Sequence, residues 1–132
     1  MLKFQLSSGK KVTIDYAPMD CALNLLRCVL NECKNAGLNL KIGVDTNLAE
    51  LLSNNKEALL NIFSSEPVLE ATQDCCTKVL YDNQKFNTDI FEDITNRQDY
   101  IPLLVLVALE NLTPFFPQAR IVLNPIQSLL LK

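Results

Sequence analysis

The spacing of apolar residues along the chain predicts a small β-hairpin followed by a series of helices. Apolar and polar residues alternate over residues 2–15, on both sides of a polar turn at residues 7–10, which is typical of a β-hairpin. From Pro18 onward, apolar residues recur every three or four positions until Gly37, as on one face of an amphipathic helix. Because a lone hairpin is marginally stable in water, we expect it to pack against the helices.

Further segments with helical spacing follow. Residues 47–63 form a second helical stretch, and residues 38–44 are either a connection or an extra strand. Ser65 and Pro67 begin a third helix, whose apolar stripe continues as far as Leu80. These elements, with those below, predict a mainly α fold in which four to five helices pack with a small N-terminal β-hairpin, a minor strand content.

The last two predicted helices differ in the character of their surfaces. Thr88 is placed to cap a fourth helix that has acidic residues in its first turns. The last helix runs from near Asp99 to Leu112 and is apolar almost all round. Such a helix lies either at the centre of the core or against a partner protein.

The chain is expected to divide into one domain and a short extension. Residues 1–117 form the helical domain with its hairpin at residues 2–15, and residues 118–132 form an apolar C-terminal extension. A terminal segment so rich in large aliphatic side chains is not expected to stay in contact with water. It either folds back onto the core or binds another protein.

Composition and charge narrow the classes of function. The chain has 132 residues, of which 48% are apolar, and a net charge of −3, so one packed domain is expected and an electrostatic nucleic-acid binder is not. Its apolar runs are shorter than the ~18–20 residues that cross a bilayer, and no secretory signal is visible, so we expect no membrane partner and a cytoplasmic location.

The residue types also restrict the chemistry. The chain has no histidine, which excludes histidine-dependent triads and histidine metal ligands. Three glycines cannot make a glycine-rich phosphate loop. We therefore expect no enzymatic activity, no catalytic residues, no cofactor and no metal.

The five cysteines are Cys21, Cys28, Cys33, Cys75 and Cys76. Their odd number and the lack of a C-x-x-C pair argue against a disulfide framework or a zinc site. Their helical spacing favours small buried side chains. The alternative is a thiol enzyme or redox sensor built on the adjacent pair at positions 75 and 76.

Several short motifs occur in a fixed order along the chain, at Val12–Pro18, Cys75–Asn83, Phe91–Asp93, Arg97–Tyr100 and Asn111–Phe116. This order resembles that of the tail assembly chaperones of long-tailed (siphovirus-type) bacteriophages and their prophages. The resemblance covers residues 1–117. Asn83 stands where the family commonly has glycine in the turn.

The resemblance implies a non-enzymatic protein that binds the tape-measure protein and keeps it soluble during assembly of the tail tube. It implies a place in the host bacterial cytoplasm and absence from the mature virion, with the tail-tube protein as a second candidate partner. Such chaperones are often made in a short form and a longer frameshifted form. The alternative is another phage or prophage interaction module, such as a head–tail joining protein or an inhibitor of a host factor.

Candidate partner-binding residues come from the apolar late part of the chain: Tyr100, Leu103, Val107, Phe115, Phe116, Leu123, Ile126 and Leu130. Buried aromatic side chains contribute much of the energy of protein interfaces. Alternatively, the aromatic residues seal the hairpin onto the helices. Arg97 and Asp99 are candidates for a local ion pair at the start of the last helix. The apolar last helix also permits self-association, and the oligomeric state stays open.

Overall fold

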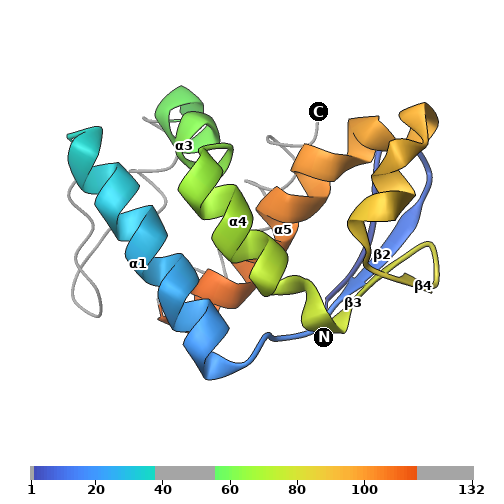
Figure 1. Ribbon diagram of the computed structural model, residues 1–132, viewed down its shortest axis with the longest axis horizontal. Coiled ribbons are helices and arrows are strands. Elements are labelled where there is room, and N and C mark those ends of the chain that lie inside the picture. Colours follow the sequence, from blue (N-terminus) through green and yellow to red (C-terminus); the bar gives the residue numbers. More distant parts are fainter. Residues whose placement is uncertain (1, 38–55, 116–132) are drawn as a thin grey trace.

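The computed structural model describes residues 2–37 and 56–115 (Figure 1). Within these residues, four α-helices and a four-stranded antiparallel sheet pack around one core. The prediction of a mainly α fold with only a hairpin is therefore wrong, because the sheet has twice the expected strands. The predicted stretches at residues 38–44 and 47–55 and the extension at 118–132 lie outside the described residues.

The sheet is a meander with strand order β1-β2-β3-β4. β1 (Leu2–Gln5) and β2 (Lys11–Ile14) form the N-terminal hairpin. β3 (Val79–Tyr81) pairs with β2, and β4 (Gln84–Lys85) pairs with β3. The hairpin is thus extended by a second hairpin that comes from a segment more than sixty residues later in the chain.

The second hairpin corrects the prediction of a helix that reached Leu80. α4 (Glu66–Asp74) ends earlier, and a 3-10 turn, η1 (Cys76–Lys78), leads into β3. Val79 and Tyr81 are buried on one face while Leu80 is exposed on the other, which is the alternation of a strand. Asp82 and Asn83 both have positive φ, as the tight turn of a two-residue hairpin requires.

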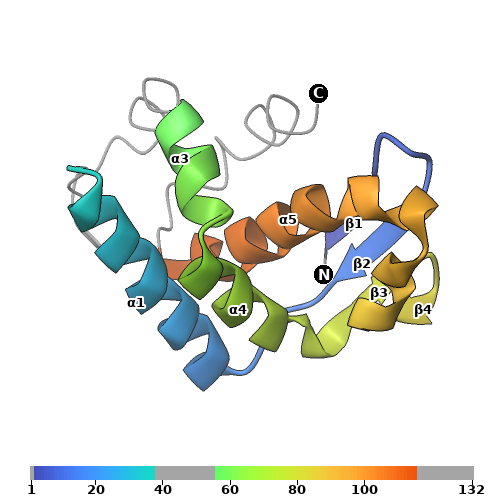
Figure 2. The ribbon, with the colours of Figure 1, turned by 45° about the horizontal axis from the view of Figure 1, so that its top comes forward.

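α1 (Met19–Asn35) agrees closely with the predicted first helix. It begins directly after Pro18 and ends before Gly37, which has a positive φ of 79°. Its buried face packs against α4, and α3 (Lys56–Phe63) lies beside both (Figure 2). Ser65 precedes α4 as predicted, but its hydroxyl donates to the Ile62 carbonyl at 2.7 Å and does not cap the helix.

α5 (Tyr100–Leu112) lies at the centre of the core and contacts α1, α4 and β2. Every side chain from Leu103 to Leu109 is buried. An apolar surface on all sides fits this position, because neighbours cover the helix over this buried stretch, while Ile101 in its first turn stays exposed. The sequence allows this helix to lie either at the centre of the core or against a partner protein. Among the described residues, it lies at the centre of the core.

The predicted fourth helix is replaced by two 3-10 segments, η2 (Thr88–Glu92) and η3 (Ile94–Asp99). The cap of the first is Asn87, whose side-chain oxygen accepts from the Asp89 amide at 3.0 Å, and not Thr88. Asp93 accepts in the same way from the Thr95 amide and begins the second. Two caps six residues apart favour two short turns over one continuous helix.

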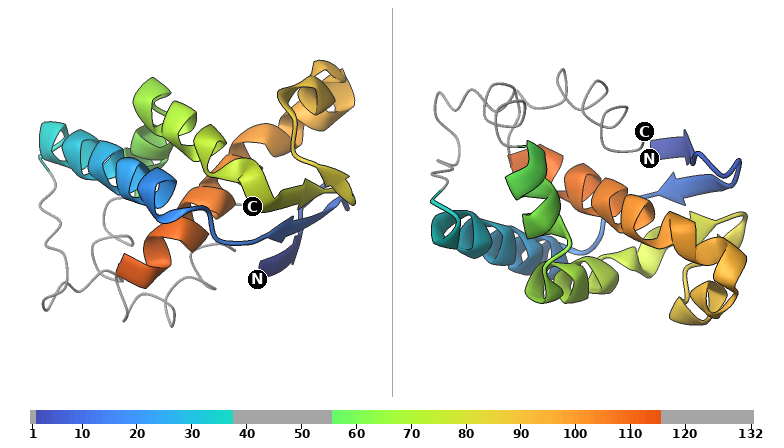
Figure 3. Two further views of the ribbon diagram at one scale, coloured as in Figure 1. Left: turned by 60° about the horizontal axis from the view of Figure 1, so that its bottom comes forward. Right: turned by 90° about the horizontal axis from the view of Figure 1, so that it is seen from above.

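The sheet has one covered and one open face among the described residues. α5 and the 3-10 segments lie on the face that carries Val12, Ile14, Val79 and Tyr81 (Figure 3). The opposite face carries Lys3, Lys11 and Lys85, which are exposed. The layers are therefore helices on one side of an antiparallel sheet, an α+β arrangement.

Candidate functional site

A buried carboxylate joins the sheet to the start of α5. The Oδ2 atom of Asp99 accepts a hydrogen bond from the hydroxyl of Tyr81 at 2.6 Å and one from Ser8 at 2.7 Å. Asp99 is only 2% exposed. One side chain thus connects the turn of the first hairpin, strand β3 and the central helix.

The ring of Tyr81, whose hydroxyl binds this carboxylate, belongs to a set of packed aromatic side chains. The ring of Phe91 lies 5.4 Å from that of Tyr81 and 4.9 Å, edge-on, from that of Tyr100. These geometries are favourable for aromatic pairs. Gln73 of α4 donates to the Tyr100 hydroxyl. We call Ser8, Tyr81, Phe91, Asp99 and Tyr100 the Asp99 cluster.

The electrostatics of the cluster keep the tyrosine protonated. Burial, followed by the hydrogen bond to Asp99, raises the pKa of Tyr81 far above its ordinary value. The phenol therefore acts as a hydrogen-bond donor throughout the neutral range. A donor fixed in this way orients the carboxylate and links strand to helix.

The predicted ion pair between Arg97 and Asp99 is absent. Arg97 instead donates through Nε to the Phe91 carbonyl at 2.9 Å and lies 3.8 Å from the carboxylate of Glu92. Both charged groups of the latter pair are largely exposed, so it contributes little to stability. Arg97 therefore ties η3 to η2, while Asp99 turns inward to the sheet.

A second polar connection fixes the other end of α5. The side-chain oxygen of Asn111 accepts from the backbone amide of Ala17 at 2.8 Å, and its amide group donates to the Val107 carbonyl at 2.9 Å. Asn111 is 2% exposed. It holds the segment between β2 and α1 against the central helix.

The candidate partner-binding residues occupy different environments. Leu103 and Val107 are both 0% exposed, so in this fold they offer no surface to a partner. Tyr100 and Phe115 are half-buried and pack against the core. Phe116, Leu123, Ile126 and Leu130 lie outside the described residues.

Within residues 2–37 and 56–115, the large apolar side chains that are exposed are not among these candidates. They are Met19, Leu80, Ile94 and Ile101. Ile94 is 76% exposed, and as a lone aliphatic between Asp93 and Thr95 it breaks the helical spacing used to find apolar faces. An isolated aliphatic in a polar stretch is the signal that could have identified it.

The cysteines are free thiols, and three of them are buried: Cys33, Cys75 and Cys76. Burial is the main cause that raises the pKa of Cys33 to about 11 and that of Cys75 and Cys76 to about 12. A thiol is a nucleophile only as the thiolate, so these groups are unreactive near neutral pH. This environment is that of core side chains and not of an activated redox pair.

The described part of the chain offers neither a metal-binding cluster nor a helix that could span a membrane. In residues 2–37 and 56–115, no group of three or more histidine, cysteine, aspartate or glutamate side chains is arranged to hold a metal ion. No helix in these two ranges has the length and apolar character needed to span a bilayer.

Comparisons with protein-family models, with curated proteins and with solved structures gave no match to this chain.

Proposed function

We propose that the chain is a non-enzymatic tail assembly chaperone of a long-tailed phage or prophage, which binds the tape-measure protein and keeps it soluble. The proposal rests on the motifs that resemble this family. The observation that supports it best is that residues from three of these motifs, Tyr81, Phe91 and Asp99, belong to one contact network. Residues that meet in space are under a common structural requirement, which would account for their occurrence together in a family.

The proposed contact surface differs from the one expected from the sequence. Ile94 and Ile101 are exposed, at 76% and 38%, on two elements that pack directly on each other, η3 and α5. The half-buried Tyr100 lies between them in the chain. We assign to these residues the contact with apolar positions of a helical tape-measure segment, a mode in which a few apolar anchors give most of the affinity.

The test is co-expression with the tape-measure protein encoded in the same genome, with any longer frameshifted product also supplied. The proposal requires that the tape-measure protein be soluble and co-elute with this chain, and only when this chain is present. A tape-measure protein that stays insoluble and unbound would overturn the proposal.

Substitutions then locate the surface. Ile94→Asp and Ile101→Asp are expected to reduce co-elution, because a charge in an apolar contact is costly to desolvate. Met19→Asp is the matched control, since Met19 is 64% exposed on α1 and away from η3. Equal co-elution of all three variants would exclude this surface. Circular dichroism of each variant checks that the fold is kept.

A further inference from the structure

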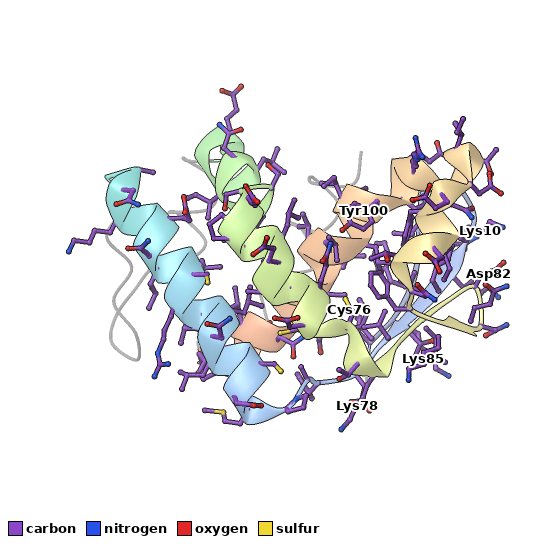
Figure 4. The ribbon with its side chains drawn as sticks, in the orientation of Figure 1. Lys10, Cys76, Lys78, Asp82, Lys85 and Tyr100 are labelled. Carbon is purple, nitrogen blue, oxygen red and sulfur yellow. The ribbon has the colours of Figure 1, made fainter. Side chains whose placement is uncertain are left out.

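Lysine side chains dominate the open face of the sheet. The strand register places one cross-strand row on this face: Lys3, Thr13, Leu80 and Lys85. Lys11 stands two residues before Thr13 in β2 and therefore points to the same side, and Lys78 is exposed at the end of η1, directly before β3. Figure 4 shows Lys78 and Lys85 on the side of the strands opposite Tyr100.

Few negative charges balance these lysines. Asp15 follows β2, and its carboxylate accepts from the Tyr16 amide at the end of the face. Asp82, in the turn between β3 and β4, is paired with Lys10 at 3.4 Å. Because the whole chain has a net charge of −3, the positive charge of this face implies negative charge elsewhere on the molecule.

That negative charge includes a stripe on α4. Glu66, Glu70 and Asp74 are four residues apart, so they share one side of the helix, and all three are exposed. α4 contains no lysine or arginine, and neither ion pair of the described residues includes these carboxylates. Like charges at this spacing repel each other, and Asp74 also faces the negative end of the helix dipole. Glu66, in the first turn, is favourably placed for the dipole, so the cost to the helix comes from the C-terminal part of the stripe, Glu70 and Asp74.

We propose that the open sheet face of one copy of this chain binds the acidic side of α4 in a second copy. The two surfaces are complementary in charge and similar in length. The stripe from Glu66 to Asp74 extends ~12 Å along a helix. The row from Lys3 to Lys85 crosses three strand spacings, ~14 Å.

The contact joins two different surfaces of the same molecule. In Figure 1, α4 lies on the near side of the helical layer, whereas Figure 4 places Lys78 and Lys85 along the lower edge. Each copy thus has one free sheet face and one free α4 after it binds a neighbour. Such a head-to-tail contact builds chains or rings of copies and not closed two-fold dimers.

The association is expected to be sensitive to salt and to concentration. Its groups are exposed lysines and carboxylates, with Leu80, at 39% exposure, as the apolar side chain within the row. Exposed charges interact over a Debye length of ~30 Å at ~10 mM salt but only ~3 Å at 1 M. Sedimentation velocity of the full chain over a range of concentrations should therefore give masses above 14.8 kDa at ~20 mM NaCl and 14.8 kDa at ~500 mM. A monomer in both buffers, or association that is unchanged by salt, would overturn the proposal.

Charge reversal tests the two surfaces separately. Lys3→Glu/Lys85→Glu on the sheet and Glu70→Lys/Asp74→Lys on α4 should each weaken self-association at low salt about tenfold or more. The α4 variant should also melt at the same or a higher temperature, since it removes repulsion within the helix and reverses the charge at its C-terminus. A loss of association in only one of the two variants would contradict the pairing of these faces.

Mixing the sheet variant with the α4 variant gives the most decisive result. The two variants together should associate again, because the basic sheet of one meets the acidic α4 of the other.

Arg27→Glu/Lys34→Glu on α1 is the control: it changes the net charge as much as the sheet variant does and leaves both surfaces intact. It should self-associate like the wild type. If the mixture fails to associate, or if the α1 control loses association, the contact is not the one proposed. None of these readouts involves the tape-measure protein, so this proposal and the proposed function can fail independently.

Discussion

The Asp99 cluster and the packing of α1 on α4 hold the molecule together by different means. In the cluster, a buried carboxylate with two hydrogen-bond donors joins elements that are far apart in sequence. Between α1 and α4, no side-chain hydrogen bond crosses the contact within the described residues, and buried side chains such as Leu25 and Val68 fill the space. Directional bonds fix one register, whereas apolar packing depends mainly on volume and so tolerates change better.

The largest change in the free energy of unfolding is expected when the carboxylate of Asp99 is removed. Asp99→Leu keeps the number of non-hydrogen atoms in the side chain but removes the acceptor of the Ser8 hydroxyl and the closer acceptor of the Tyr81 hydroxyl, which retains only Asn96 Oδ1 at 3.3 Å. We expect the free energy of unfolding to fall by about 3 kcal/mol, measured by urea denaturation. A loss below ~0.5 kcal/mol would mean that the cluster has no special role.

A double-mutant cycle tests whether the hydrogen bond between Tyr81 and Asp99 accounts for this loss of stability. Tyr81→Phe should lower stability more in the wild type than in the Asp99→Leu background, because there the hydroxyl has already lost its closer acceptor and retains only Asn96 Oδ1, at 3.3 Å. We expect a coupling energy of ~0.5–3 kcal/mol. Additive effects would show that the hydrogen bond is not what stabilises this region.

The buried thiols of the helical region make the free energy of unfolding depend on pH, and the effect is expected to be of intermediate size. Cys33, Cys75 and Cys76 have pKa values of about 11, 12 and 12 when folded, against 9.0 for an ordinary thiol. Above pH 9 the unfolded chain releases these protons first, so stability is complete below pH 9 and falls as the pH rises towards 12. Urea denaturation at a series of alkaline pH values measures the loss.

A control variant separates thiol ionisation from other alkaline effects. Cys76→Ala removes one of the raised pKa values, so its stability should decrease less steeply above pH 9 than that of the wild type. Rapid labelling of the buried thiols in native protein at neutral pH would contradict the assignment and would favour the redox alternative instead.

A smaller effect is expected for a shape-preserving change in the helical region. Leu25→Met keeps the apolar character and nearly the volume of a side chain that is 0% exposed. It should cost less than ~1.5 kcal/mol in the same urea experiment. A cost equal to that of Asp99→Leu would remove the contrast between the two regions.

The smallest effect concerns an exposed pair at the edge of the cluster. Lys10 and Asp82 lie 3.4 Å apart, and both side chains are about half exposed. Lys10→Ala should change the free energy of unfolding by no more than ~1 kcal/mol, and less at high salt. A larger loss would mean that the stabilising network extends beyond the buried groups.

Features that depend on neighbours in the chain could be predicted from the sequence. The first helix, its end near Gly37 and the first hairpin follow from spacing and turn residues. Helical spacing predicts burial of all five cysteines, but only Cys33 is buried within an α-helix: Cys75 and Cys76 are buried beyond the end of α4, and Cys21 and Cys28 are partly exposed. By contrast, the apolar character of Leu103 and Val107, which suggests partner binding from the sequence, reflects their place in the core.

Features that depend on residues far apart in the chain could not be predicted from the sequence. Val79–Tyr81 is short and apolar, and a run of this length fits the end of a helix as well as a strand. Only its pairing with β2 decides between the two. Likewise, nothing next to Asp99 in the chain indicates that Ser8 and Tyr81 donate to its carboxylate, since both come from other elements.

The sequence by itself therefore determined which segments have an apolar face, where the first helix ends and which residues favour the core. The tertiary structure decided that the sheet has four strands, that α5 is buried from Leu103 to Leu109, and that Asp99 binds the sheet and not Arg97. The physical reason is the range of the interactions. Helical periodicity and turn geometry act over a few residues, whereas strand pairing and buried hydrogen bonds join residues that only the complete fold brings together.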